Sequence, residues 1–253
     1  MEKNGFGIAA VSYDSHETLR DFARQHGIRF PLLSDRESTV IRSFGILNAN
    51  IAPMLRAHGV PHPVQYLVAP DGLVIRKYFV PNYQHRVTAS AVAFREFGAV
   101  SEGAATVTLR SGALTLTMGL SAERAFAGQE IGFFARFTLE TGWHVYGTPV
   151  PDGYTATSVI FDGTAIARQS FELPAATPAR MDFLKDFVPV YTGTFQGIGS
   201  LLLRFPLDEG TTVLSGMVRF QQCSDSVCEP PETIPFELPL TLAPFMDATR
   251  KKS

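Results

Sequence analysis

The sequence predicts an α+β protein with two domains, an α/β lobe followed by an antiparallel β-sandwich. Helix-like and strand-like segments alternate up to about Phe97. From Thr106 onward, short strand-like runs recur at regular spacing, which is typical of a sandwich. The length of 253 residues also fits two domains of about 150 residues each. We therefore expect a first domain over 1–97, a linker over 98–105 and a second domain over 106–248.

The composition excludes several classes of function. A hydrophobic content of 45% and a charged content of 18% are typical of a globular protein. The net charge of −2 gives no reason to expect a nucleic-acid partner. No apolar run reaches the roughly 18–20 residues that a membrane-spanning helix needs, and no signal peptide is visible at the start. Motifs for a cofactor or a metal ion are not apparent either, so we expect neither.

The first domain shows the alternation of an α/β lobe. The apolar run Phe6–Tyr13 predicts a strand buried on both faces. Amphipathic patterns predict one helix over His16–His26 and a second from about Ser34 to Phe44. The remaining expected elements are two strands and a helix: Val64–Val68, Leu73–Val80 and Thr88–Phe97.

The second domain is expected to be all-β. Its expected strands are Thr106–Leu109, Leu114–Gly119, Glu130–Leu139, Trp143–Tyr146, Ser158–Phe161, Leu201–Leu207 and Gly216–Gln222. Pro174–Lys185 holds two prolines and little periodicity, which predicts a loop. From Thr233 apolar residues alternate with polar residues or proline, which predicts a last strand with one buried face. Pro235 and Pro239 fall on its outward face, as suits an edge strand.

Both cysteines of the chain, Cys223 and Cys228, lie between the apolar run Val213–Phe220 and that last strand. This arrangement predicts a hairpin with the loop Ser224–Val227. Residues that face each other across a hairpin have Cα atoms roughly 4.5–5.5 Å apart, which a disulfide accepts.

The residues alone leave three uses of the cysteine pair open: a reversible dithiol, an inert staple, or half of a metal site. A staple across so short a ring contributes only about 2 kcal/mol to stability, which favours the reversible dithiol. Zinc takes four ligands, which disfavours the metal site. Among the neighbours, Asp225, Glu229 and Glu232 disfavour a thiolate and only Arg219 favours one, so we expect no strongly activated nucleophile.

The run CSDSVCEPPET, which follows Phe220 and two glutamines, resembles the N-terminal domain of the thiol:disulfide interchange protein DsbD. The resemblance covers about Ala105–Ala248. It implies an immunoglobulin-like sandwich in the periplasm or another extracytoplasmic space. It also implies catalytic residues Cys223 and Cys228, which exchange with a thioredoxin-like partner domain through a mixed disulfide. The family's best-known member has one more residue between its cysteines.

Two further segments carry the same resemblance. The run GWHVY ending at Tyr146 looks like the family's aromatic strand beneath the active site, which places His144 and Tyr146 near the cysteines. The competing interpretations are a solvent-facing His144, which we favour, and a core Tyr146. Lys185, Asp186 and Phe187 look like the cap loop that shields the cysteines, although Phe187 can also be an ordinary buried anchor. The family analogy assigns contact with the partner to Cys228.

The first domain resembles the AhpC/TSA peroxiredoxin and thioredoxin-like superfamily, in the runs VSYDSHETLRDFARQHGIRFPLLSD and VPHPVQYLVAPDG. Pro63, three residues before Tyr66, matches the family's cis-proline. In that fold the strand and helix with the reactive cysteine precede the point where this chain begins, and residues 1–222 contain no cysteine. We therefore expect a truncated thioredoxin-like lobe whose missing elements lie upstream.

Together these observations predict a redox relay module, a thiol–disulfide oxidoreductase that uses the Cys-x4-Cys pair and no cofactor. One alternative is a non-enzymatic interaction module with a structural disulfide. The other is a fragment of an AhpC/TSA-type peroxidase whose catalytic cysteine lies upstream.

Overall fold

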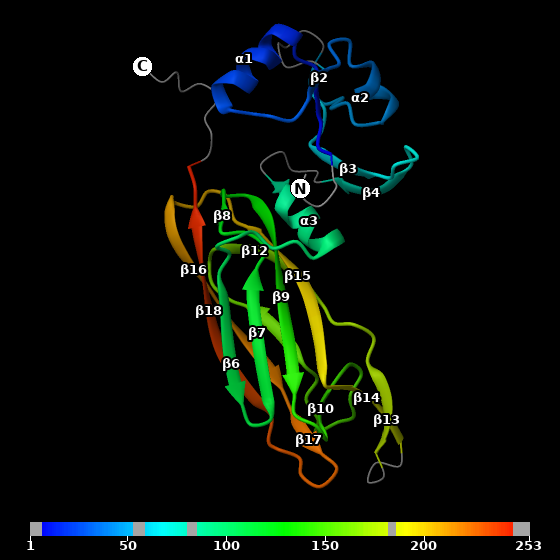
Figure 1. The fold of residues 1–253 in the computed structure, drawn as a ribbon, viewed down its shortest axis with the longest axis vertical. Helices are drawn as coiled ribbons and strands as arrows, with labels where there is room; N and C mark the ends of the chain where they lie inside the picture. Colours follow the sequence, from blue (N-terminus) through cyan, green and yellow to red (C-terminus); the bar gives the residue numbers. More distant parts are fainter. Residues whose placement is uncertain (1–6, 53–58, 80–84, 182–185, 245–253) are drawn as a thin grey trace. The chain divides into compact units, whose positions relative to one another are not determined.

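The computed structural model of the chain describes residues 7–52, 59–79, 85–181 and 186–244. The chain divides into two compact units, Met1–Arg86 and Val87–Ser253. The first unit holds the α/β elements and the second is rich in strands (Figure 1). The finer division predicted from the sequence, with a linker over 98–105, stays a prediction.

The first unit contains two small sheets and two helices. Its elements are β1 (Ala10–Ser12), α1 (His16–His26), β2 (Leu32–Ser34), α2 (Thr39–Ser43), β3 (Val64–Val68) and β4 (Val74–Phe79), and β5 (Arg86–Val87) lies at the boundary. Strand β1 pairs in parallel with β2, and β3 pairs antiparallel with β4. Helix α1 has the predicted bounds, because Ser15 caps its first turn and Gly27 ends it in the left-handed conformation.

Two expectations for the secondary structure of this unit are wrong. Val11 in β1 is 45% exposed rather than buried, because β1 belongs to a two-stranded sheet and not to the centre of a larger one. Helix α2 starts at Thr39, later than predicted. The carboxylate of Asp35 accepts hydrogen bonds from the backbone N–H groups of Thr39 (2.9 Å) and Ile41 (2.8 Å), which places residues 35–38 before the helix.

The cis peptide bond predicted before Pro63 is absent from the described residues. Their cis bonds precede Pro149 and Pro206. A cis proline typically sits in a tight turn, whereas Pro63 leads directly into β3, which begins at Val64. The backbone N–H of His62, the residue before Pro63, donates a hydrogen bond to the carbonyl of Ile46 (2.7 Å), which fixes the backbone just before the strand. The family feature therefore does not carry over to Pro63.

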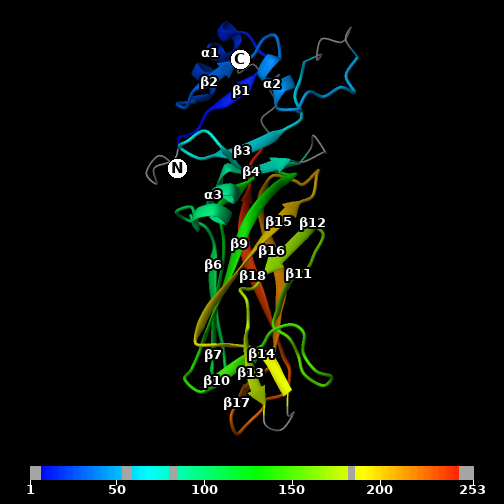
Figure 2. The same ribbon diagram turned by 90° about the vertical axis from the view of Figure 1, so that its right-hand side faces the viewer.

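The second unit is an immunoglobulin-like sandwich with a helix. Its elements are α3 (Ala89–Phe97), β6 (Thr106–Ser111), β7 (Leu114–Leu120), β8 (Arg124–Ala125), β9 (Gln129–Leu139), β10 (Trp143–Tyr146), β11 (Ser158–Phe161), β12 (Ile166–Glu172), β13 (Thr177–Met181), β14 (Asp186–Thr192), β15 (Thr194–Leu203), β16 (Gly210–Phe220), β17 (Gln222–Ser224) and β18 (Glu232–Leu242). One sheet has the order β12-β15-β9-β7-β6 and the other has the order β11-β16-β18-β8. Figures 1 and 2 show both sheets running along the length of this unit.

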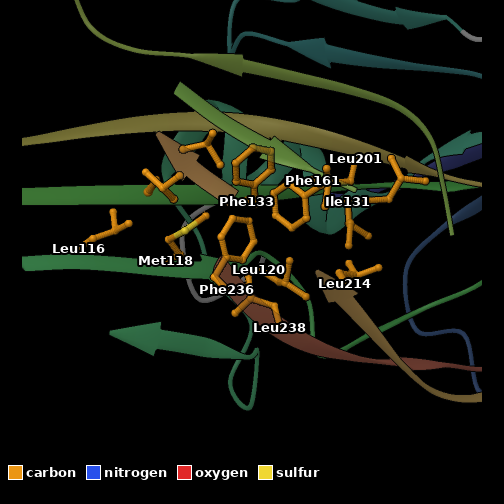
Figure 3. Close-up of a cluster of buried hydrophobic side chains, with 14 of the residues drawn as sticks. Leu116, Met118, Leu120, Ile131, Phe133, Phe161, Leu201, Leu214, Phe236 and Leu238 are labelled. Carbon is orange, nitrogen blue, oxygen red and sulfur yellow. The ribbon is translucent and has the colours of Figure 1, made fainter. Parts of the chain in front are cut away.

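The core of the second unit lies between these two sheets. Phe133 of β9 meets Phe161 of β11 edge to face, with ring centroids 4.8 Å apart, and Phe161 meets Phe236 of β18 at 4.9 Å (Figure 3). In β18 the predicted alternation is confirmed, since its apolar residues from Phe236 onward are buried and Pro235 and Pro239 are exposed. Only its last two residues pair with β8, so most of β18 is an edge.

The loop predicted over Pro174–Lys185 is wrong, because Thr177–Met181 forms strand β13. Strand β13 pairs antiparallel with β14, and Pro178 lies opposite Pro189. An edge strand tolerates proline because one side of its backbone has no ladder to join, and β13 is the edge of its sheet. Pro178 within the strand and Pro174 just before it therefore made this segment resemble a loop in the sequence.

Among the described residues, no helix is long and apolar enough to cross a membrane.

Candidate functional site

A third sheet, with the order β13-β14-β10-β17, carries the cysteine loop. Figure 1 shows its strands at the end of the sandwich away from α3. The main ladder ends where Phe220 of β16 pairs with Glu232 of β18. The chain then leaves that sheet as β17 and pairs with β10, which places Cys223 opposite His144. The cysteine loop is thus held by a sheet different from the one that leads into it.

Cys223 and Cys228 form a disulfide, and their Cα atoms are 4.1 Å apart. The backbone N–H of Ser224 donates to the carbonyl of Val227 (2.7 Å), which closes the predicted four-residue loop between the cysteines. The backbone therefore places the two sulfurs within bonding distance, as the hairpin argument predicted.

The two cysteines differ in exposure. Cys223 has no exposed surface and packs against Tyr146, Val188 and Val190, whereas Cys228 is exposed. Because access selects which sulfur of a disulfide is attacked, an incoming thiolate can reach Cys228 far more readily than Cys223.

Tyr146 lies beneath the disulfide. Its hydroxyl donates to Sγ of Cys223 (3.2 Å) and is 3.6 Å from Sγ of Cys228. Burial, and to a lesser degree the neighbouring Tyr154, raises the pKa of Tyr146 to about 12. The phenol therefore stays protonated at neutral pH and acts as a hydrogen-bond donor to sulfur.

His144 is buried, so the solvent-facing interpretation favoured from the sequence is wrong. It is 8% exposed because β10 is an inner strand, where His144 lies between Cys223 of β17 and Thr192 of β14. Its ring meets that of Tyr146 edge to face at 5.3 Å. Burial lowers the pKa of His144, and the negative charge of Asp225 opposes this effect. The imidazole is therefore neutral at pH 7, and its residue lies opposite Cys223 in the sheet.

Two glutamines anchor the loop, and the sequence reasoning gave them no role. Gln221 accepts a hydrogen bond from the N–H of Thr155 (3.1 Å) and donates to the carbonyl of Glu229 (3.0 Å). The side chain of Gln222 accepts a hydrogen bond from the N–H of Ala113 (3.0 Å), and the backbone carbonyl of Gln222 accepts one from the N–H of Glu229 (3.0 Å). Both side chains are buried. The detectable signal was a pair of polar residues directly after an apolar strand.

The predicted cap falls partly outside the described residues, since Lys185 and the side chain of Asp186 are not among them. Asp186 begins β14, and the next residue, Phe187, pairs with Arg180 of β13. Phe187 is 64% exposed, which rules out the alternative of an ordinary buried anchor. Its role as a cap over the cysteines stays a prediction.

A groove of about 600 Å³ borders the exit of the cysteine loop. Trp143, Pro230 and Pro231 line it together with the carboxylates of Glu140, Glu229 and Glu232. The groove next to the cysteine loop therefore has an acidic lining, and Cys228 is not itself among its lining residues. The weak activation of the Cys228 thiol that the sequence predicts stays a prediction.

Two family models match separate parts of this chain. Residues 118–239 match the family described as thiol:disulfide interchange protein DsbD, N-terminal. The second unit holds a DsbD N-terminal-like domain. Residues 1–77 match the AhpC/TSA family, so the first unit is a thioredoxin-like AhpC/TSA segment. Both resemblances stated from the sequence are confirmed.

Three solved structures are similar to parts of this chain, all at TM-scores below 0.5. The N-terminal periplasmic domain of ScsB from Proteus mirabilis shares 14% identity at a TM-score of 0.43, covering 56% of this chain and 52% of that chain. The reduced DsbD N-terminal domain from Neisseria meningitidis shares 14% identity at a TM-score of 0.31. The match covers 55% of this chain and 85% of that chain. The GAE domain of yeast GGA1 shares 9% identity at a TM-score of 0.32. The match covers 53% of this chain and 98% of that chain. A search of curated proteins found no match.

Proposed function

We propose that the DsbD N-terminal-like domain exchanges electrons with a thioredoxin-like partner through Cys223 and Cys228. The observation that carries this proposal is the difference in exposure within the disulfide, with Cys228 exposed and Cys223 buried. A staple needs no such difference, whereas an exchange reaction needs one sulfur open to attack and one that leaves.

The exchange follows from the placement of these groups. A partner thiolate attacks Sγ of Cys228, a new S–S bond forms there, and the Cys223–Cys228 bond breaks. The electron pair of the broken bond stays on Sγ of Cys223, where the Tyr146 hydroxyl donates a hydrogen bond to it. The partner's second thiol then displaces Cys228, so that the partner becomes a disulfide and this chain a dithiol. The reverse sequence oxidises this chain.

The anchored loop supports reversibility. Glu229, the residue after Cys228, is held by hydrogen bonds to Gln221 and Gln222 that do not involve sulfur. Because these bonds persist when the disulfide is broken, the two thiols stay close together and can reform the bond without a rearrangement of the fold.

We further propose an extracytoplasmic location and a supporting role for the first unit. A disulfide between the chain's two cysteines is the form that persists in oxidising compartments, and the family resemblance points the same way. Residues 1–222 contain no cysteine, so the AhpC/TSA segment is proposed as a scaffold or docking surface.

The reduction potential of the disulfide tests this function. The oxidised protein is equilibrated with glutathione redox buffers and the thiols are counted by mass spectrometry, with the Cys223→Ser/Cys228→Ser double variant as the blank. A potential above about −300 mV, together with reduction by a thioredoxin dithiol, is expected of a redox relay. A potential below about −300 mV and no exchange with thioredoxin would assign the disulfide to a structural interaction module instead.

A further inference from the structure

His144 holds a buried polar atom without a partner. Among the described residues, the buried side-chain nitrogen and oxygen atoms with no hydrogen bond are Nε2 of His144 and Oγ1 of Thr157. A buried polar group without a partner destabilises the state in which it occurs, because it has lost its hydrogen bonds to water. Because such atoms are rare in folded proteins, one at a candidate redox site needs an explanation in terms of function.

The residues around His144 limit which group can form a hydrogen bond with its Nε2. It faces Cys223 on one side and Thr192 on the other, and its ring contacts that of Tyr146. The Tyr146 hydroxyl is already directed at Sγ of Cys223. The charged group that acts on His144 is Asp225, which lies in the exposed cysteine loop. The buried neighbour whose hydrogen-bonding capacity changes with the redox state is thus Cys223.

Reduction of the disulfide would give Cys223 a hydrogen-bond donor that it lacks in the oxidised protein. A disulfide sulfur carries no hydrogen, so Cys223 cannot donate to Nε2 while the bond to Cys228 exists. After reduction, Cys223 bears an S–H group that is a hydrogen-bond donor. Directly opposed residues on paired strands have Cβ atoms about 4.5–5.5 Å apart, which brings a thiol and an imidazole within reach.

We propose that His144 is a redox-linked positioning residue whose Nε2 accepts a hydrogen bond from the thiol of Cys223 in the reduced protein and has no partner in the oxidised one. This inference rests on the proposed thiol–disulfide exchange. His144 would then destabilise the disulfide and stabilise the dithiol, so the site would oxidise its partner more strongly than the same site without the histidine.

Electrons and protons balance in this scheme. When the partner thiolate attacks Cys228, the electron pair of the S–S bond stays on Sγ of Cys223. That sulfur takes up one proton, which the partner's second thiol releases as it becomes part of the partner's disulfide. The new S–H of Cys223 donates to Nε2 of His144 while the sulfur accepts from the Tyr146 hydroxyl, so each polar atom in the buried cluster has a partner.

The reduction potentials of two variants test the proposal. His144→Phe keeps an aromatic ring but has no acceptor, and His144→Gln restores an acceptor near the position of Nε2. We expect His144→Phe to favour the disulfide about tenfold in the glutathione equilibrium, which corresponds to about 30 mV more negative. We expect His144→Gln to recover most of this shift. The matched control is Thr157→Val, which removes the other unpaired buried atom and should leave the equilibrium within twofold of the wild type.

The nitrogen-15 chemical shift of His144 Nε2 provides a second measurement on the unmodified chain. It should move on reduction in the direction of an accepted hydrogen bond, and this result is available even if His144→Phe does not fold. An unchanged nitrogen-15 shift on reduction would overturn the proposal. Equal reduction potentials for the wild type and both variants would also overturn it, and so would an equally negative shift of the potential in His144→Phe and His144→Gln. These measurements use glutathione alone, so they stand apart from any failure to exchange with a thioredoxin-like partner.

Discussion

The hydroxyl of Tyr146 lies 3.2 Å from Sγ of Cys223, and both residues are fully buried. In the proposed exchange, the leaving sulfur of Cys223 would therefore be next to a fixed hydrogen-bond donor and not to water. A buried thiolate without such a donor is costly, because burial disfavours the charged form.

Replacement of Tyr146 by Phe should slow the attack of a partner thiolate on Cys228 by about fivefold, since a lost hydrogen bond costs about 1 kcal/mol. Stopped-flow thiol exchange with reduced thioredoxin measures this rate. The control is Tyr191→Phe, which removes a 2.8 Å hydrogen bond from another tyrosine hydroxyl to the carbonyl of Pro174. That variant should lose a similar amount of stability and keep its exchange rate. Equal rates in the two variants would contradict a role for Tyr146 at the leaving sulfur.

His144 should make the oxidised protein less stable as the pH falls. Burial lowers its pKa in the folded state, while the unfolded chain binds a proton near the ordinary value of 6.5. The unfolded state therefore binds more protons below pH 6.5, and the free energy of unfolding decreases as the pH drops through that range. Urea denaturation at pH 7 and pH 5 measures the effect. In His144→Phe the decrease between these two pH values should be smaller, and a decrease as large as in the wild type would count against a buried neutral imidazole.

Gln221 should matter more to the reduced protein than to the oxidised one. In Gln221→Leu the hydrogen bonds to Thr155 and Glu229 are lost. The hydrogen bonds of Gln222 remain in both forms, and the oxidised form has the disulfide as an additional restraint on the loop. We expect the melting temperature to fall further in the reduced form. Gln169→Leu is a matched control, because Gln169 also makes two backbone hydrogen bonds, both to Phe161 (2.8 and 2.7 Å), away from the cysteines. It should lower the melting temperature of both forms equally, and the same behaviour in Gln221→Leu would dismiss the anchoring role.

Phe187→Ala tests the proposed cap. If the ring of Phe187 shields the cysteines, its removal should raise the rate at which iodoacetamide alkylates Cys228 in the reduced protein by about twofold or more, since alkylation follows access to the sulfur. Ile160→Ala removes another exposed apolar side chain, on β11, and serves as the control. An alkylation rate equal to that of the control would end the assignment of Phe187 as a cap.

Local patterns predicted the parts of the fold that depend on local interactions. Helix α1 has the predicted bounds because Ser15 and Gly27 mark its ends, and β18 alternates as its sequence does. The hairpin geometry of Cys223 and Cys228 followed from the same alternation. By contrast, β13 was missed because proline at an edge strand resembles proline in a loop.

The parts of the site that depend on distant pairing could not be predicted. The burial of His144 follows from its place between β14 and β17, and nothing near residue 144 in the sequence indicates either neighbour. The roles of Gln221 and Gln222 depend on Thr155 and Ala113, which are remote in the chain. The family resemblance placed His144 and Tyr146 near the cysteines, but the hydrogen bonds that define their chemistry required the structure.

In the proposed exchange, the partner thiolate attacks Cys228 and the sulfur of Cys223 leaves. This assignment is tested most directly by incubating Cys223→Ser and Cys228→Ser separately with a thioredoxin-like domain that lacks its resolving cysteine, followed by mass spectrometry of the intact mixed disulfide. We expect a trapped mixed disulfide with Cys223→Ser, through the exposed Cys228, and little or none with Cys228→Ser, whose remaining cysteine is fully buried. Equal trapping by both variants, or trapping through Cys223 alone, would contradict it.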